Sequence, residues 1–213
     1  MCAILGFTSP SLKKEQVLPY FEKTKSRGPD DTRLEPAGSG MLGFHRLAIM
    51  GLHPEGMQPF HRGGDMAVCN GELYGFRPVK KALEAKGYVF ASDSDCEIIL
   101  PLWKEYGTDM FAKLDAEFAM IIYDAASDSL VAARDPIGIR PLFYGYLADG
   151  SIIFASEAKN LVGLCAHVFP FPPGHYYKDG KFVRYADLTT VTRYSDDDLD
   201  TVTKKIREKL ISA

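Results

Sequence analysis

A cysteine stands directly behind the initiator methionine, at the head of the short apolar run MCAILGF. If Met1 is removed, Cys2 becomes the first residue and carries a thiol and a free α-amine together. Such an amine has a reference pKa of about 7.7–8.0, which suits proton transfer near neutral pH. Nucleophile and base on one residue is an arrangement that serves covalent catalysis. The alternative interpretation is that Cys2 is a small apolar residue that opens a buried strand.

Four short stretches place polar groups where strand or loop composition does not demand them. They are Arg27–Asp30 (RGPD), His45–Ile49 (HRLAI), Asn70–Glu72 (NGE) and Asp93–Glu97 (DSDCE). Each also has an ordinary structural interpretation: a turn, a surface charge on a strand, a hairpin and a helix cap, respectively. Taken singly, none of the four indicates chemistry.

The elements that must position these stretches follow from the apolar patterns. Short β-rich runs, such as Phe118–Asp124 and Ser129–Asp135, are separated by turn residues and predict an antiparallel meander. Helical patterns lie between the strand groups, at residues 13–25, 77–86 and 95–106. Strands in groups with helices between them favour an α+β fold over a doubly wound parallel sheet.

Composition narrows the class of protein. The chain has 213 residues and a formal net charge of -3, which gives no electrostatic reason to expect nucleic acid or a membrane surface as partner. No stretch approaches the length needed to span a bilayer, and the first apolar run is too short for a secretory signal. Four widely spaced cysteines and scattered histidines show no metal-ligand spacing. We therefore expect a metal-free, cytoplasmic globular protein with reduced thiols.

Taken together, the motifs resemble the glutaminase domain of class II glutamine amidotransferases, which are N-terminal nucleophile hydrolases. Their amino-acid sequences are most similar to those of the asparagine synthetase branch. The resemblance runs through nearly the whole chain. Its motifs are Met1-Cys2, RGPDD, HRLAI, GMQPF (56–60), NGELY, SDSDCEII, RDPIGIRPLF (134–143), ASEAKNL (155–161) and FPPGHYY.

The resemblance implies a fold and a site. The fold is a four-layer αββα sandwich within the α+β class. Cys2 would attack the side-chain amide of glutamine, and the Asn70 side chain and the Gly71 N–H would stabilise the oxyanion. Arg46 would hold the α-carboxylate of glutamine, and Glu72 and Asp95 would receive its α-ammonium. The loop at Leu47, Ala48, Ile49 and Met50 would complete the glutamine-binding segment.

The resemblance also implies partners. We expect residues 1–193 to form the glutaminase domain and 194–213 to be a linker and the first helix of an ATP-using synthetase domain. That helix carries an apolar stripe, formed by Leu199, Val202, Ile206 and Leu210. ATP and Mg are expected only in the synthetase domain, and a homodimer is a further expectation.

The expected activity is glutamine hydrolysis that supplies ammonia for asparagine synthesis from aspartate. One alternative is an amidotransferase with another acceptor, a sugar phosphate or phosphoribosyl diphosphate. A second alternative is a non-catalytic glutamine-binding module in which Cys2 is never exposed.

Overall fold

The computed structural model describes residues 1–212 and shows two six-stranded antiparallel sheets packed face to face. The first sheet has the strand order β10-β8-β9-β1-β3-β2. Its strands are β1 (Ala3–Thr8), β2 (Asp31–Ala37), β3 (Gly40–Arg46), β8 (Phe143–Tyr146), β9 (Ile152–Ala155) and β10 (Val168–Pro170). The second sheet has the order β12-β11-β7-β6-β5-β4. Its strands are β4 (Phe60–Arg62), β5 (Asp65–Leu73), β6 (Ala116–Asp124), β7 (Ser129–Arg134), β11 (His175–Lys178) and β12 (Lys181–Arg184).

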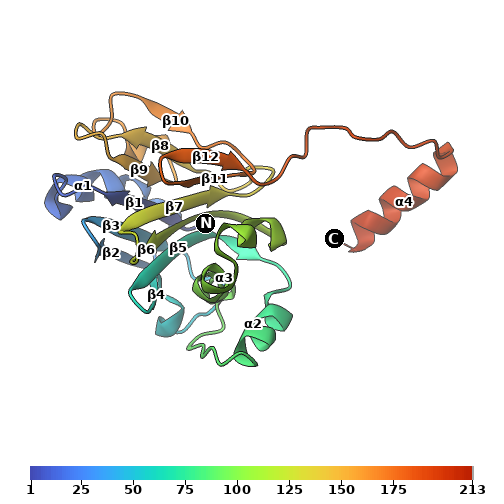
Figure 1. The fold of residues 1–213 in the computed structure, drawn as a ribbon, viewed down its shortest axis with the longest axis horizontal. Coiled ribbons are helices and arrows are strands. Elements are labelled where there is room, and N and C mark those ends of the chain that lie inside the picture. Colours follow the sequence, from blue (N-terminus) through green and yellow to red (C-terminus); the bar gives the residue numbers. More distant parts are fainter. Residues whose placement is uncertain (213) are drawn as a thin grey trace.

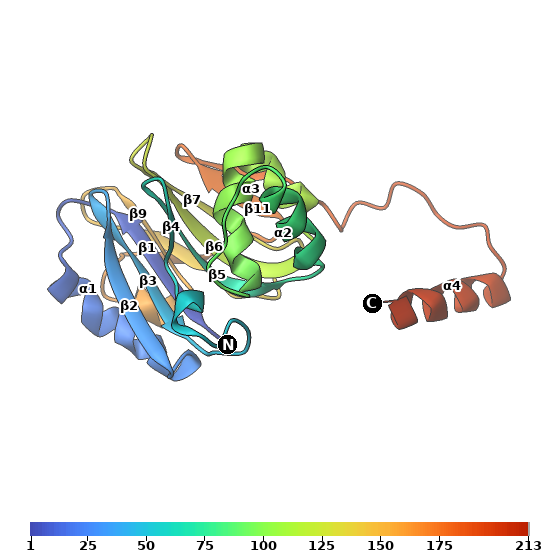
Figure 2. The ribbon, with the colours of Figure 1, turned by 90° about the horizontal axis from the view of Figure 1, so that it is seen from below.

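Helices cover the outer faces of both sheets, so the molecule has four layers (Figure 2). Helix α1 (Lys14–Phe21) and the 3-10 segment η1 (Glu22–Arg27) lie on the first sheet. Helices α2 (Phe76–Glu84) and α3 (Ile99–Tyr106) lie on the second sheet, with η3 (Asp95–Ile98) leading into α3. The other 3-10 segments are η2 (Pro54–Gly56), η4 (Gly107–Lys113) and η5 (Ala158–Asn160). The predicted αββα sandwich of the α+β class is confirmed.

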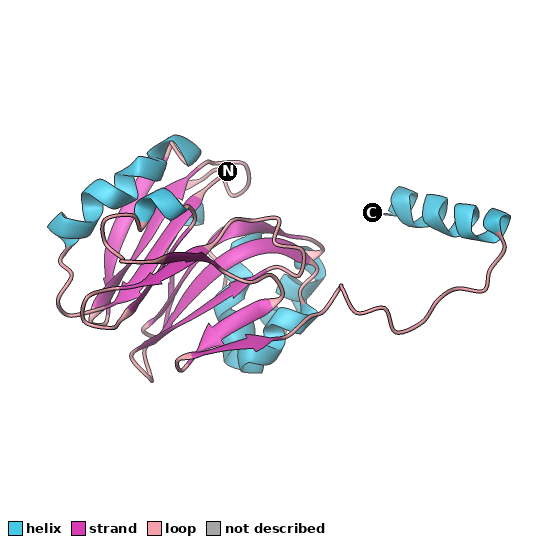
Figure 3. Cartoon of the chain, turned by 90° about the horizontal axis from the view of Figure 1, so that it is seen from above, coloured by secondary structure: helices cyan, strands magenta, loops and turns pink. Residues whose placement is uncertain are grey.

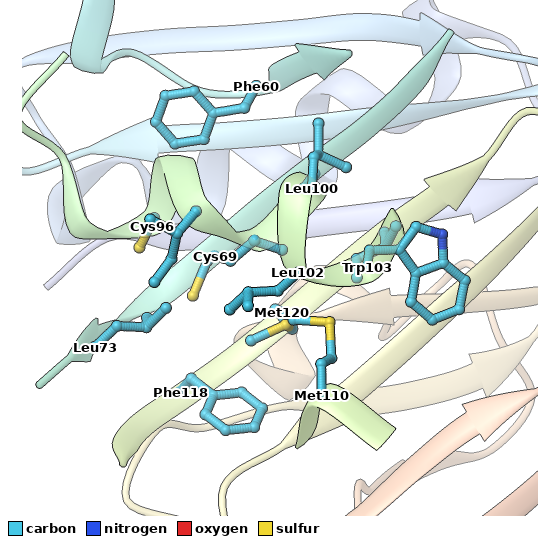
Figure 4. Packing of buried hydrophobic residues seen from close by; sticks show 14 of the residues in the cluster. Phe60, Cys69, Leu73, Cys96, Leu100, Leu102, Trp103, Met110, Phe118 and Met120 are labelled. Carbon is cyan, nitrogen blue, oxygen red and sulfur yellow. The ribbon is translucent and has the colours of Figure 1, made fainter. Parts of the chain in front are cut away.

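The central strands are apolar on both faces because each face meets another layer. Along β6, Ala119 and Ile121 face the opposite sheet, while Phe118, Met120 and Ile122 face the helices. Figure 4 shows the helix-side layer, where Leu100, Leu102 and Trp103 of α3 pack over Met120 and Phe118. This burial explains why Phe118–Asp124 reads as a continuous apolar run in the sequence.

The helix predicted over residues 13–25 is divided in the structure into α1 and η1. Thr24 Oγ1 donates a hydrogen bond to the Phe21 carbonyl at 2.9 Å, and Asn160 Nδ2 donates to the Tyr20 carbonyl at 2.8 Å. These side chains occupy carbonyls that an α-helix would use in its next turn, so the chain continues as a 3-10 segment. The contact partner, Asn160, is distant in sequence and could not be read from the local pattern.

The tail leaves the sandwich after β12. Residues 185–198 contain no strand or helix, and α4 (Leu199–Ser212) follows with no buried residue. Figures 1 and 3 show α4 apart from the two sheets, at the end of this extended segment. Within residues 1–212, no helix is long and apolar enough to cross a membrane.

Candidate active site

A cavity of about 70 Å³ lies at the end of the sandwich where β1 begins and β3 ends. It brings together residues predicted from four separate motifs: Cys2, Arg46, Asn70, Gly71, Glu72 and Asp95. Leu47, Ile49 and Met50 of the predicted loop also line it. Ala48 does not, and its N–H donates to Asp30 Oδ2 at 2.8 Å, which ties the loop to the RGPD turn.

The Cys2 side chain is half-buried at the base of this cavity, with Met1 beside it. Its Sγ accepts a hydrogen bond from the Leu47 N–H at 3.4 Å and lies 3.6 Å from the Leu47 carbonyl. Burial raises the pKa of the Cys2 thiol. The thiol is therefore protonated near neutral pH, and attack on an electrophile requires a nearby base.

Two further motifs hold the start of β1 in place. Arg27 of the RGPD turn donates from Nε to the Cys2 carbonyl at 3.1 Å and pairs through Nη1 with Glu157 at 2.9 Å. Ser156 bonds Ile4 in both directions, through its Oγ at 2.8 Å and its N–H at 2.9 Å. The N-terminal residues are thus fixed by groups more than twenty positions away in sequence.

Asn70 is 2% exposed and lies on the face of β5 that looks toward the other sheet. Its Nδ2 is buried and has no hydrogen-bond partner within residues 1–212. A buried amide nitrogen without an acceptor costs free energy, so native proteins seldom keep one without a use. Because this donor borders the same cavity as the Cys2 thiol, it is placed to receive a developing oxygen anion.

Gly71 follows Asn70 in a part of β5 that pairs with β6 on one side only, because β4 ends its pairing at Ala67. The residues two positions before and after Gly71 direct their N–H groups to the open side, away from β6: Cys69 donates to Gln58 Oε1 at 2.6 Å and Leu73 to Asp95 Oδ2 at 2.7 Å. Gly71 lies between them and borders the cavity, so its N–H is directed there too.

The pairing on the far side of β6 supports this direction for the Gly71 N–H. Phe118 lies opposite Gly71, and both its backbone groups turn toward Asp135. The N–H and the carbonyl of Phe118 therefore make no hydrogen bond with Gly71. A Cβ at position 71 would approach the Glu117 carbonyl oxygen to 2.7 Å, so the close approach of β6 also requires glycine here.

Arg46 and His45 end β3 on opposite faces, as adjacent strand residues must. Arg46 is 7% exposed and points into the cavity, where only its Nη2 bonds within the described chain, to the Gly51 and His53 carbonyls. The other guanidinium nitrogens are free for a ligand, and Arg46 also holds the loop after it. His45 is fully buried on the face that α1 covers, where it stacks on Phe21 and bonds Thr32, so it has a structural role.

Two carboxylates complete the cavity wall. Asp95, which is 4% exposed, accepts the Leu73 N–H and thereby ties η3 to β5. Burial, and then the charge of Asp95, raise the pKa of Glu72, while the charge of Arg140 opposes both. The cavity is thus lined by the Arg46 guanidinium and by the carboxyl groups of Glu72 and Asp95.

Arg140, Gln58 and Ser94 also line the cavity and were not among the predicted site residues. Arg140 lies in the RDPIGIRPLF motif and Gln58 in GMQPF, so the sequence analysis recognised both motifs but predicted no role for these two residues. Within residues 1–212, no group of three or more His, Cys, Asp or Glu residues is placed to hold a metal ion.

Comparison with known proteins identifies the family of this chain. The model of the glutamine amidotransferase domain matches residues 1–176. A glutamine-hydrolyzing asparagine synthetase of Sandersonia aurantiaca is 38% identical over 188 residues, which cover 86% of this chain and 35% of that protein. One from Arabidopsis thaliana is 38% identical over 178 residues, covering 82% of this chain and 30% of that protein. The chain therefore spans about a third of the length of these relatives.

A solved structure shares the fold at lower identity. The glutamine phosphoribosylpyrophosphate amidotransferase from B. subtilis, complexed with ADP and GMP, superposes with a TM-score of 0.69 at 20% identity. The match covers 87% of this chain and 49% of that chain. It extends the sandwich architecture to a protein with little sequence similarity.

Proposed function

Since the chain belongs to the glutamine amidotransferase domain family, we propose that it hydrolyses the side-chain amide of glutamine to glutamate and ammonia, with Cys2 as nucleophile. The observation that carries this proposal is the unpartnered, buried Asn70 Nδ2 beside the Cys2 thiol. Such a donor is of use where an oxyanion forms, and an amide attacked by a thiol forms one.

The reaction begins once Met1 is removed and the α-amine of Cys2 is free. The amine takes the proton of the thiol, and Sγ attacks the δ-carbon of glutamine. The resulting oxyanion is held by Asn70 Nδ2 and the Gly71 N–H. The ammonium form of the α-amine then gives its proton to the leaving nitrogen, and ammonia departs. Water attacks the thioester in the same way, which releases glutamate and restores the thiol.

Selectivity for free glutamine requires recognition of both its charged α-groups. The guanidinium of Arg46 binds the α-carboxylate through its positive charge and through the N–H groups that remain free while Nη2 holds the Gly51 and His53 carbonyls. Glu72 and Asp95 receive the α-ammonium. Leu47, Ile49 and Met50 form the side of the pocket, with Ala48 holding the loop to Asp30.

We further propose that the ammonia serves asparagine synthesis from aspartate in a synthetase domain or subunit, where ATP and Mg are used. The support is 38% identity to proteins named as glutamine-hydrolyzing asparagine synthetases. A sugar-phosphate or phosphoribosyl diphosphate acceptor is less well supported, because similarity at 20% identity extends to the fold alone. A cytoplasmic setting fits the four free thiols.

Two measurements on the native protein test the central proposal. Intact-mass spectrometry should show that Met1 is absent, and an assay of glutamate release from glutamine should show turnover. A protein that keeps Met1 and binds glutamine without hydrolysis would instead be the non-catalytic module.

Replacement of Arg46 by lysine should weaken glutamine binding by roughly 1–3 kcal/mol, since the charge remains but lysine has too few N–H donors to hold both the loop carbonyls and the ligand. The change should appear mainly in KM, with a smaller effect on kcat. Arg33, a half-buried arginine on β2 that does not border the cavity, supplies the matched control in Arg33→Lys. An Arg46→Lys variant with the KM of the unaltered protein would remove this residue from the site.

Helix α4 should exchange its amide hydrogens much faster than β6 in a dilute monomer. Leu199, Ile206 and Leu210 are 80%, 54% and 74% exposed, so nothing in the sandwich protects the apolar stripe. We propose that residues 194–213 contact a synthetase domain, or a second copy of the chain in the homodimer. Hydrogen exchange at several protein concentrations checks this. Strong protection that is independent of concentration would mean that the stripe packs on its own domain.

A further inference from the structure

Glu72, which borders the cavity, has a second glutamate as its neighbour on the adjacent strand. Glu72 of β5 and Glu117 of β6 are direct partners in the antiparallel register, so their side chains lie on the same face. Like charges in directly opposed positions are unfavourable in a sheet. The pair therefore needs a cation or a proton.

Arg140 supplies that cation. Its Nη2 pairs with Glu117, and its side chain is only 14% exposed. Its Nε is buried without a partner within residues 1–212, so the guanidinium keeps donor capacity after it has paired with Glu117. Arg140 and Glu72 border the same cavity, and the positive charge lowers the pKa of Glu72.

The loop that carries Arg140 is fixed from both sides. The Asp135 carboxylate accepts N–H groups from Gly138 at 2.6 Å and from Arg140 itself at 3.1 Å. The Arg134 guanidinium donates to the Arg140 carbonyl at 2.7 Å. The backbone of Arg140 is thus held in position before any ligand arrives, and its charge is directed at one place.

We propose that Arg140 is a positioning residue that offsets the Glu72–Glu117 pair and so keeps Glu72 as the carboxylate that receives the α-ammonium of glutamine. This assignment rests on the proposed function, and it adds to that function a residue that helps the site select for the α-ammonium of glutamine. Other groups facing Glu72 are Asp95 from η3, which disfavours its ionisation, and the Tyr74 phenol, which stays neutral between pH 5.5 and 8.

The test is glutamine binding by calorimetry between pH 5.5 and 8, in a Cys2→Ala background so that no turnover occurs. Arg140→Met should weaken binding, and the loss should grow as the pH falls, because the pKa of Glu72 rises further without the cation. Below that pKa, each unit of rise weakens binding about tenfold. Arg140→Lys should preserve most of the pH profile.

Two further variants separate this role from a structural one. Arg140→Met combined with Glu117→Gln removes both the cation and the opposed charge, and should recover much of the binding lost in Arg140→Met. Glu117→Gln alone frees the guanidinium for Glu72 and should extend tight binding to lower pH.

Equal losses at all pH values in Arg140→Met, or no recovery in the double variant, would overturn the assignment while the proposed function stands. If the Cys2→Ala protein with Arg140 intact binds no glutamine at any pH, the proposed function fails, and the assignment fails with it.

Discussion

Replacement of Cys2 by alanine should lower glutamine hydrolysis by at least about 10⁴-fold, because no other group borders the cavity with both a thiol and an adjacent amine. Cys69 and Cys96 also reach the cavity, but they are buried within the helix-side layer. The hydrogen bond with Cys69, and then burial, raise the pKa of Cys96 well above its usual value, so its thiol is a poor nucleophile. The rate of glutamate release measures the effect.

The N-terminal amine can be tested apart from the thiol. A protein that carries extra residues before Cys2, in a form that cannot be trimmed, keeps the thiol but loses the free amine. It should be as inactive as Cys2→Ala. Cys165→Ala is the matched control, since Cys165 packs in the layer between the first sheet and α1, away from the cavity. Normal turnover by the extended protein would contradict the N-terminal nucleophile mechanism.

Replacement of Asn70 by alanine should lower kcat by about 10²–10³-fold, the usual effect of losing one oxyanion donor. Glutamine binding should change much less, because the donor acts on charge that develops during the reaction. Stability should also change little, because Nδ2 makes no hydrogen bond within the described residues that could be lost. Steady-state kinetics and chemical denaturation measure the two effects on one variant.

Asn160 offers the contrasting control. Its Nδ2 donates to the Tyr20 carbonyl at 2.8 Å and to Thr24 Oγ1 at 3.0 Å, and none of these three residues borders the cavity. Asn160→Ala should therefore cost about 1–3 kcal/mol of stability and leave kcat of the folded protein near normal. Should Asn70→Ala also lose stability and keep its kcat, Asn70 would be a structural residue and the oxyanion assignment would be wrong.

The pattern of residue types along the chain was enough to predict the α+β class, because alternation and turn residues identify strands locally and the helical patterns lie between the strand groups. The αββα sandwich itself was predicted from the resemblance of the motifs to class II glutamine amidotransferases. The residue types at Cys2, Arg46, Asn70 and Asp95 were informative only in combination, because each short motif alone has an ordinary structural interpretation. Their expected roles toward glutamine came from the same resemblance, which compares motifs in their order along the chain and needs no contact in space.

Other features depended on contacts between segments far apart in the chain. The direction of the Gly71 N–H follows from the pairing of β6 with Asp135, and the structural role of His45 follows from its stacking on Phe21. The end of α1 is set by Asn160, which lies some 140 positions away. None of these partners can be read from local spacing.

Arg140 shows most clearly the difference between what a local motif predicts and what contacts in the folded chain decide. The sequence contains its motif, and an arginine in a turn would ordinarily be a solvated charge. Only the register of β5 on β6 places Glu72 opposite Glu117, and only the folded loop brings the guanidinium to that pair. The sequence by itself determined the α+β class and, through the family that its motifs resemble, the layers and the chemical groups expected in the site. The tertiary structure decided which charges meet, because electrostatic partners are selected by distance in space and not by separation along the chain.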